Sequence, residues 1–209
     1  MSTIQERQQF VQQFIAPVTT NQQVITAFQT IPREVFVPAE LRAAAYEDRA
    51  LAIGEGQTIS QPSLVAHMTE LLHLTGQETV LEVGTGSGYQ AAILSQLAKQ
   101  VYSIERIASL TQQANDHLKQ LNITNVEVLV GDGAQGYPTQ APFDAIIVTA
   151  GAKQLPQPLI QQLKEGGRIV APINNRLMAG TKVNGKVQLN SHGLVEFVPL
   201  ITSSAEMTS

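Results

Sequence analysis

Apolar residues recur at helical spacing through the N-terminal part of the chain. The segment 4–15 is rich in glutamine, and its apolar stripe predicts an amphipathic helix that Pro17 ends. The stripe consists of Ile4, Val11, Phe14 and Ile15. Further helices are predicted over 21–30, 39–47 and 63–74. Gly76 is expected to cap the last of them. The proline-bracketed segment 31–38 is predicted to be a non-helical connection, and 52–62 is predicted to be a loop.

From residue 77 onward, short apolar strands alternate with helices. The predicted strands cover 79–83, 100–105, 126–130, 143–149 and 168–172. The predicted helices between them cover 88–98, 107–121 and 156–164. Regular alternation of this kind indicates a parallel sheet with helices on both faces. We therefore predict an α/β fold with a Rossmann-like, doubly wound, mostly parallel sheet.

The C-terminal part changes pattern again. Asn184 and Gly185 form a hairpin-turn signal between two short runs at 181–183 and 186–189, which predicts an antiparallel hairpin. The run 194–201 is predicted to form a last strand. We expect a single domain over 1–209, divided into three parts. These are an N-terminal helical extension with the 52–62 loop (1–75), a core (76–201) and a disordered tail (202–209).

Composition narrows the class of protein. The chain has 209 residues, of which 43% are apolar and 14% charged, as expected for a globular domain. A net charge of -4 offers no basic surface to nucleic acid. Cysteine is absent and the four histidines have no metal-ligand spacing, so neither a disulfide nor a metal site is expected. Without a signal-peptide pattern or an apolar run of about 18 residues, we expect a cytoplasmic protein that does not enter membranes.

Glycines gather between the strand 79–83 and the helix after it. Gly84, Gly86 and Gly88 stand where a backbone can turn tightly and approach a ligand, although glycines at such a turn are weak evidence alone. Dinucleotide sites favour G-x-G-x-x-G. Here the third glycine comes one position earlier, and Glu82 precedes the first. The E-x-G-x-G-x-G pattern resembles motif I of the class I methyltransferases, which bind S-adenosylmethionine. An acid there would suit the ammonium and sulfonium charges.

Acidic residues follow the next two strands. Glu105 lies 21 positions after Gly84, where a carboxylate can accept from both hydroxyls of a ribose. Asp132, between Gly131 and Gly133, resembles the next cofactor motif, in which the aspartate accepts from the adenine amine. The alternative interpretations are a solvated acid for Glu105 and an ordinary Asx turn for Asp132. Asp144, at the start of a later strand, is predicted to be structural.

The polar segment before the helix at 63–74 is the second candidate site. It consists of Gln57, Thr58, Ile59, Ser60, Gln61 and Pro62. By itself it is equally well explained by a helix start, with Ser60 or Ser63 as the N-cap. In context, 45–62 followed by 65–72 resembles the hallmark of the protein-L-isoaspartate O-methyltransferases. The resemblance extends from about residue 23 to about residue 201.

This resemblance implies a repair enzyme that uses S-adenosylmethionine. Its substrate would be the free α-carboxylate of L-isoaspartyl residues in damaged proteins and peptides, and the methyl ester would collapse to a succinimide. A carboxylate is already ionised at neutral pH, so the reaction needs orientation, worth roughly 7–11 kcal/mol, rather than a base or a metal. His67 is therefore interpreted as a helix surface residue. A monomer is expected.

The resemblance also implies the site residues. Ser60 matches the active-site serine, whose hydroxyl would hold a carboxylate oxygen. Substrate contacts are expected from Thr58, Ser60 and Val198. Cofactor contacts are expected from Gln57, Ile59, Ser60, Glu82, Gly84, Thr85, Gly86, Ser87, Gly88, Tyr89, Glu105, Asp132, Gly133 and Thr149.

The chain departs from the family pattern in two places. Asn174 stands where a glycine is usual. This difference puts in question both how the segment 173–180 lines the cleft and how active the enzyme is. Glu196 stands where a basic or polar residue is common, and strand alternation predicts that it points away from the cleft. Three other interpretations therefore stay open. The chain could methylate another carboxylate or bind the cofactor without turnover. More distantly, it could be a nicotinamide dehydrogenase.

Overall fold

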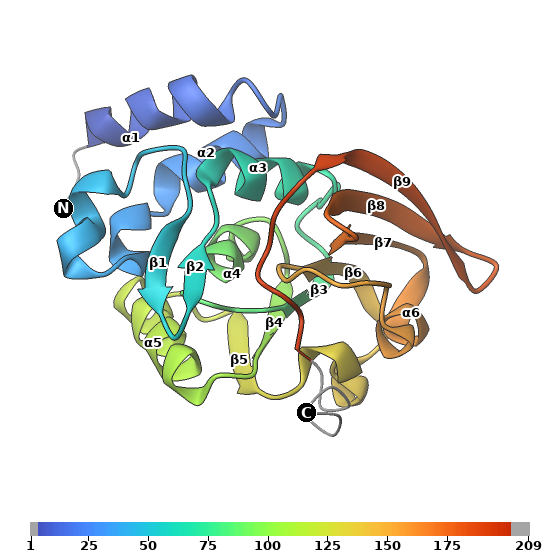
Figure 1. The fold of residues 1–209 in the computed structure, drawn as a ribbon. Helices are drawn as coiled ribbons and strands as arrows, with labels where there is room; N and C mark the ends of the chain where they lie inside the picture. The colour runs from blue at the N-terminus through green and yellow to red at the C-terminus, as the bar shows by residue number, and fades with distance from the viewer. Residues whose placement is uncertain (1–3, 202–209) are drawn as a thin grey trace.

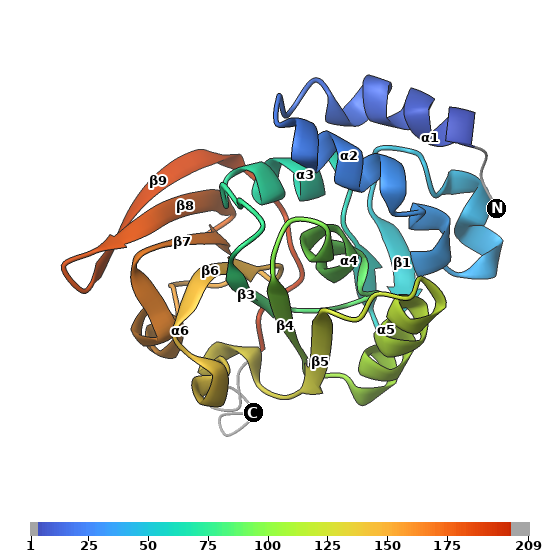
Figure 2. The ribbon, with the colours of Figure 1, turned by 180° about the vertical axis from the view of Figure 1, so that it is seen from behind.

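The computed structural model describes residues 4–201 and contains one large mixed sheet. Its strand order is β5-β4-β3-β6-β7-β8-β9 (Figure 1). The strands are β3 (Thr79–Val83), β4 (Gln100–Glu105), β5 (Val126–Val130), β6 (Phe143–Val148), β7 (Leu163–Ile173), β8 (Arg176–Val183) and β9 (Lys186–Leu194). Strands β5 to β7 are parallel, and β8 and β9 continue the sheet antiparallel. The predicted mostly parallel α/β sheet is confirmed. Figure 2 shows β5 and β9 at its opposite edges.

Alternate residues of the central strands face opposite sides of the sheet, so each strand supplies two cores. Val80 and Ile147 belong to one core, which the helices α4 (Tyr89–Ser95) and α5 (Ala108–Gln120) help to form. Leu81 and Ile146 belong to the other, which contains Leu159 of α6 (Gln157–Gln162). Both faces are therefore covered, which explains why these strands carry apolar residues on both faces, with few buried polar exceptions such as Glu82 and Ser103.

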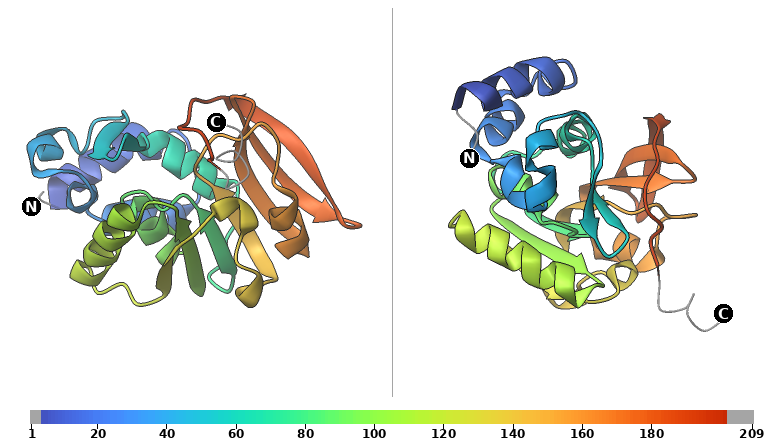
Figure 3. Two further views of the ribbon diagram at one scale, coloured as in Figure 1. Left: turned by 60° about the horizontal axis from the view of Figure 1, so that its bottom comes forward. Right: turned by 60° about the vertical axis from the view of Figure 1, so that its left-hand side comes forward.

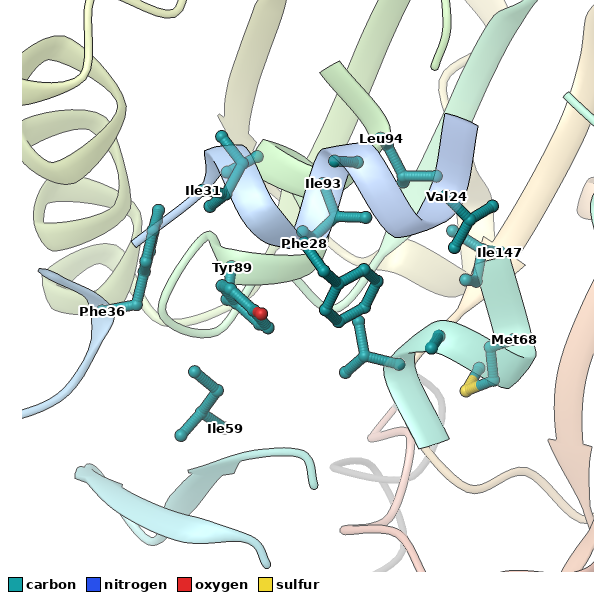
Figure 4. Close-up of a cluster of buried hydrophobic side chains, with 14 of the residues drawn as sticks. Val24, Phe28, Ile31, Phe36, Ile59, Met68, Tyr89, Ile93, Leu94 and Ile147 are labelled. Carbon is teal, nitrogen blue, oxygen red and sulfur yellow. The ribbon is translucent and has the colours of Figure 1, made fainter. Parts of the chain in front are cut away.

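The N-terminal extension packs on the first of these faces. It comprises α1 (Ile4–Phe10), the π turn η1 (Val11–Ile15), α2 (Gln22–Thr30), the 3-10 turns η2 (Arg33–Phe36) and η3 (Ala39–Ala44), and α3 (Pro62–Glu70). In Figure 4, Phe28 and Ile31 of this extension lie close to Ile93 and Tyr89 of α4. Both views of Figure 3 place α1 and α2, in blue, on the other side of the molecule from β7 to β9.

Three local predictions in this region need correction. Segment 52–62 is not an open loop, because β1 (Leu51–Gly54) and β2 (Gln57–Ile59) pair antiparallel. Their turn residues, Glu55 and Gly56, both have positive φ (53° and 68°), as a tight hairpin turn requires. Gly76 does not cap α3, which already ends at Glu70. The 3-10 turn η2 occupies part of the connection predicted as non-helical.

The C-terminal hairpin is confirmed, and the last predicted strand is wrong. Asn184 and Gly185 have φ of 53° and 76° and join β8 to β9. After Leu194 the chain leaves the sheet and forms only an isolated bridge, between Pro199 and Gly151. Strand β7 also begins earlier than predicted, with Leu163 paired to Phe143. Segment 202–209 lies outside the described residues. Within 4–201, no helix is long and apolar enough to cross a membrane.

The departure at Asn174 has a structural explanation. Asn174 and Asn175 have φ of 48° and 59° and form the tight turn between β7 and β8. Asparagine is among the residues that tolerate this left-handed region best, so it can take the place of glycine here.

Candidate functional site

A cavity lies at the carboxyl ends of β3, β4 and β6, where open α/β sheets bind ligands. The β1–β2 hairpin and the extended segment after β9 contribute to its walls, and Figure 1 shows this segment descending past the hairpin. All but three of the residues predicted for the site line it. They are Gln57, Thr58, Ile59, Ser60, Gly84, Thr85, Gly86, Ser87, Tyr89, Glu105, Gly133, Thr149 and Val198. The lining also includes Val65, Val83, Gln90, Ile104, Arg106, Ile107, Ala150, Pro199, Leu200 and Ile201.

Glycine is required at the first position of the loop after β3. Gly84 has φ of 96°, and a Cβ there would lie 2.4 Å from the Thr149 Oγ1 atom. That hydroxyl donates to the Val83 carbonyl at 3.0 Å. The close approach of Thr149 and the positive φ together leave no room for a side chain. The loop therefore passes directly against Thr149, just after β6.

Glu105 is held in place by the backbone around it. Its Oε2 atom accepts from the Gly86 N–H at 2.9 Å, and its Oε1 atom accepts from the Ile107 N–H at 3.0 Å. The carboxylate lines the cavity from the end of β4 and braces the glycine loop. Each oxygen keeps accepting capacity for a further hydrogen bond.

The structure does not bring Glu82 into the lining. Its side chain is 0% exposed, and its Oε2 atom accepts from the Ser103 hydroxyl at 2.5 Å. Ser103 in turn lies 2.5 Å from the Thr85 hydroxyl. Burial raises the pKa of Glu82 to about 8; the Ser103 hydrogen bond opposes this shift, and the charge of Glu105 adds to it. At neutral pH Glu82 is therefore mainly protonated, contrary to the expectation of a charged contact.

Gly88 and Asp132 also lie outside the lining, and both have structural contacts. A Cβ on Gly88, whose φ is 88°, would lie 3.1 Å from the Ala114 Cβ, so glycine lets α4 approach α5. Asp132 accepts from the Ala134 N–H at 3.0 Å and caps the turn η4 (Gly133–Gln135), in agreement with the Asx-turn alternative. Asp144 holds Lys164 at 2.6 Å and the Thr79 N–H at 2.9 Å, as a structural residue should.

A buried cation that the sequence interpretation missed lies behind the Ser60 segment. Arg33 is 0% exposed and donates to the Ser60 carbonyl at 3.0 Å. Its guanidinium carbon lies 5.5 Å from the centroid of the Tyr89 ring, at the start of α4. Burial raises the pKa of Tyr89, which keeps the phenol protonated. The signal that could have revealed Arg33 is a pair of charged residues, Arg33 and Glu34, inside a proline-bracketed segment whose other residues are apolar.

An open groove, here called the side groove, adjoins the cavity and shares Thr58 and Val198 with it. Its remaining lining residues are Val18, Ala50, Gln61, Ser63, Leu64, His67, Leu194, Val195, Glu196 and Phe197. Consecutive residues from 194 to 198 all line it because this segment is not a strand. Glu196 is exposed and does not line the cavity, in keeping with its predicted orientation away from the cleft, although the strand on which that prediction rested does not form. Burial, followed by the effect of His192, lowers the pKa of His67.

The cavity combines backbone donors with one fixed carboxylate. Within residues 4–201, no group of three histidine, aspartate or glutamate side chains could hold a metal ion. Exposed glycine backbone and an acceptor at the end of β4 suit a nucleoside. The Ser60 hydroxyl can donate to a second, anionic molecule.

Comparison with known proteins assigns the chain to a family. The model of the protein-L-isoaspartate (D-aspartate) O-methyltransferases matches residues 5–205. A protein-L-isoaspartate O-methyltransferase from Methanoculleus marisnigri is 50% identical over 201 residues, covering 94% of this chain and 91% of its own length. The enzyme of the same name from Photobacterium profundum is 51% identical over 185 residues, covering 87% of this chain and 88% of its own.

Solved structures agree with this result. A structure named protein-L-isoaspartate O-methyltransferase superposes with a TM-score of 0.86 at 31% identity, covering 92% of this chain and 65% of its own. A Plasmodium falciparum protein described under the same name, in complex with S-adenosyl-L-homocysteine, gives a TM-score of 0.82 at 23% identity. It covers 93% of this chain and 98% of its own, and at that identity supports the fold alone.

Proposed function

The chain belongs to the protein-L-isoaspartate (D-aspartate) O-methyltransferase family, and from that premise we propose its reaction. It transfers a methyl group from S-adenosylmethionine to the free α-carboxylate of L-isoaspartyl residues in damaged proteins and peptides, which starts repair through a succinimide. One observation supports this proposal above the others. The glycine loop of the sheet and Ser60 of the N-terminal extension line the same cavity.

The residues of the cavity fit S-adenosylmethionine. Glu105 stands at the strand end, where a carboxylate accepts from ribose hydroxyls, and Gly84, which has no room for a side chain beside Thr149, keeps the turn after β3 tight. Ile104 and Ile107 offer apolar surface beside Glu105. Gly88 and Asp132 would contribute through the loop geometry, because neither lines the cavity. When bound, the cofactor supplies a methyl group already activated by a sulfonium charge.

Ser60 and its neighbours bind and orient the substrate. The Ser60 hydroxyl donates to a carboxylate oxygen of the isoaspartyl residue, while Thr58 and Val198 form the walls beside it. The Ser60 carbonyl is held by Arg33 at 3.0 Å, which fixes the backbone from which this hydroxyl projects. Because the nucleophile is already ionised, these residues act by orientation and by excluding water. No lining residue is required as a base.

Glu82 acts indirectly in this scheme. Its carboxyl group holds Ser103, and Ser103 holds Thr85 of the glycine loop. Glu82 is therefore a positioning residue for the loop rather than a cofactor contact.

The first test is a matched pair of peptides, one containing L-isoaspartate and one containing normal L-aspartate. With labelled S-adenosylmethionine, we expect methylation of the isoaspartyl peptide alone. Ser60→Ala should lower kcat/KM roughly ten- to hundredfold, as for the loss of a hydrogen bond to a charged group, while S-adenosylhomocysteine affinity is kept. Ser191→Ala, on the edge strand β9, is the matched control.

Two outcomes would contradict this assignment. Methylation of neither peptide, with S-adenosylhomocysteine still bound, would indicate another carboxylate substrate or a relative without turnover. Equal loss of turnover and cofactor affinity in Ser60→Ala would remove the role given to Ser60. A cytoplasmic location, a monomeric state and the absence of nucleic-acid partners stay predictions from the sequence.

A further inference from the structure

The side groove adjoins the catalytic cavity. Thr58 and Val198 line both. When the isoaspartyl group of a polypeptide occupies the cavity, the residues next to it in that polypeptide must therefore pass close to Thr58 and Val198. The isoaspartyl residue is part of a chain, and the atoms on either side of it need space. The side groove offers that space beside Thr58.

The rim of the side groove is unusually apolar for exposed surface. Val18 and Leu194 are 37% and 77% exposed, and both line it. Ile201, which is 40% exposed, lines the adjoining cavity. Within residues 4–201, half of the six large hydrophobic side chains that stay exposed therefore line either the side groove or the cavity beside it. Exposed apolar surface gathered at one place is typical of a binding surface.

The charge of the side groove comes from one residue. Glu196 is the only acidic or basic residue in the lining apart from His67. Burial disfavours the charged form of His67 and lowers its pKa, and His192, with a ring centroid 6.0 Å away, acts in the same direction. Behind the groove, Asp48 accepts from the Ser63 N–H at 2.8 Å and from the Ser63 hydroxyl at 2.7 Å. Among the residues that line the groove, the charge that remains at neutral pH is therefore acidic.

We propose that the side groove binds the residues flanking the isoaspartyl residue of the substrate, and that Glu196 makes it favour a basic side chain there. This inference rests on the proposed function and adds a substrate preference to it. The carboxylate attracts a lysine or arginine and repels an aspartate or glutamate, while Leu64, Leu194 and Phe197 contact the aliphatic part of the side chain.

The test uses isoaspartyl peptides that differ at one flanking position. Lysine, glutamine or glutamate is placed on the N-terminal side in one series and on the C-terminal side in another. We expect kcat/KM to fall in the order lysine, glutamine, glutamate in at least one series. The lysine-to-glutamate ratio should be roughly three- to tenfold at low salt, as for a partly exposed charge pair, and should shrink at high salt.

Variants then locate the preference. Glu196→Gln should bring the lysine-to-glutamate ratio close to one, and Glu196→Lys should reverse the order of the peptides. Glu127→Gln, an exposed acid on β5 at the other edge of the sheet, should keep the wild-type ratio. S-adenosylhomocysteine affinity reports that each variant is folded, because Glu196 does not line the cofactor cavity.

The outcomes separate the two proposals. Equal kcat/KM for all peptides in both series of the wild type would overturn the flanking preference while leaving the methyl transfer intact. If the lysine-to-glutamate ratio of kcat/KM is unchanged in Glu196→Gln, Glu196 is not the residue that sets the preference. If the glutamine-flanked isoaspartyl peptide is not methylated at all, the proposed function fails, and the inference that rests on it fails too.

Discussion

Glu82 is an acid that the fold shields completely from water. It sits in β3, between strands β4 and β6, and its carboxyl group is hydrogen-bonded to Ser103 of β4. An ionised carboxylate at such a position would be costly, so it holds its proton instead. At the scale of a single residue, the position before the glycine loop thus shows an acid used as a hydrogen-bonding group rather than as a charge.

The protonated state of Glu82 makes stability depend on pH. Its pKa is about 8 in the folded protein against 4.5 for the free group. Between these values the folded state holds a proton that the unfolded state has lost. The free energy of unfolding therefore falls as the pH rises from about 4.5 to about 8, by up to about 1.4 kcal/mol per unit. Glu82→Gln should remove this fall and become the more stable form above about pH 8.

Thermal or denaturant unfolding of both proteins across this range measures the effect. Other groups titrate equally in the two proteins, so the difference between the two curves isolates Glu82. If the free energies of unfolding of the wild type and Glu82→Gln change in parallel from pH 5 to pH 9, Glu82 does not retain its proton in the folded state.

At the scale of elements, the β1–β2 hairpin is held by the segment before it. Arg33 of η2 donates to the Ala45, Arg49 and Ser60 carbonyls at 3.4, 3.3 and 3.0 Å. A fully buried arginine is uncommon, and here its fork binds three backbone oxygens. Figure 4 shows Tyr89, over which the guanidinium lies, close to Phe36 of η2 and Ile59 of β2. One cation thus connects the hairpin to the helix that follows the glycine loop.

Arg33→Lys tests this connection. Lysine keeps the charge but cannot reproduce the planar fork. We expect a loss of roughly 1–3 kcal/mol in the free energy of unfolding, from carbonyls left without donors. We also expect a larger fall in kcat for isoaspartyl peptide than in S-adenosylhomocysteine affinity. Arg176→Lys, at an exposed position on β8, should match the wild type. A stability loss with kcat unchanged would reduce Arg33 to a structural residue.

At the scale of the whole molecule, the cavity joins segments that are distant in the sequence. The hairpin, the glycine loop, the end of β4 and the segment 198–201 each supply part of its lining. A ligand that contacts all of them binds only the folded chain. Its binding free energy therefore adds to the stability of the entire fold.

S-adenosylhomocysteine should raise Tm in a concentration-dependent way. At a hundred times its Kd, the gain in the free energy of unfolding is about 2.7 kcal/mol. Glu105→Gln removes a charged acceptor and should weaken the affinity roughly tenfold or more, so the same shift requires more ligand. NAD should give no comparable shift. If S-adenosylhomocysteine raises the Tm of the wild type and of Glu105→Gln equally at every concentration, Glu105 is a solvated acid without a role in binding. If NAD raises Tm more than S-adenosylhomocysteine does, a dehydrogenase is favoured.

The sequence by itself determined the features that depend on neighbouring residues. Periodicity placed the core strands, because a buried parallel strand must be apolar on both faces. Asn184 and Gly185 specified the C-terminal turn, because few residues accept positive φ. The glycine spacing, together with the 57–62 segment, indicated the family and most of the cavity lining.

Tertiary structure decided whatever depends on a partner far along the chain. Segment 194–201 has the composition of a strand, but a strand needs an open edge to pair with, and this segment instead crosses to Gly151. The hairpin at 51–59 pairs locally, yet Arg33 and Asp48 hold it in place from outside. Glu82 and Glu105 are both acids on adjacent strands. Only packing makes the first a buried, protonated group and the second a carboxylate in the cavity, because burial and hydrogen-bond partners are set by the assembled sheet.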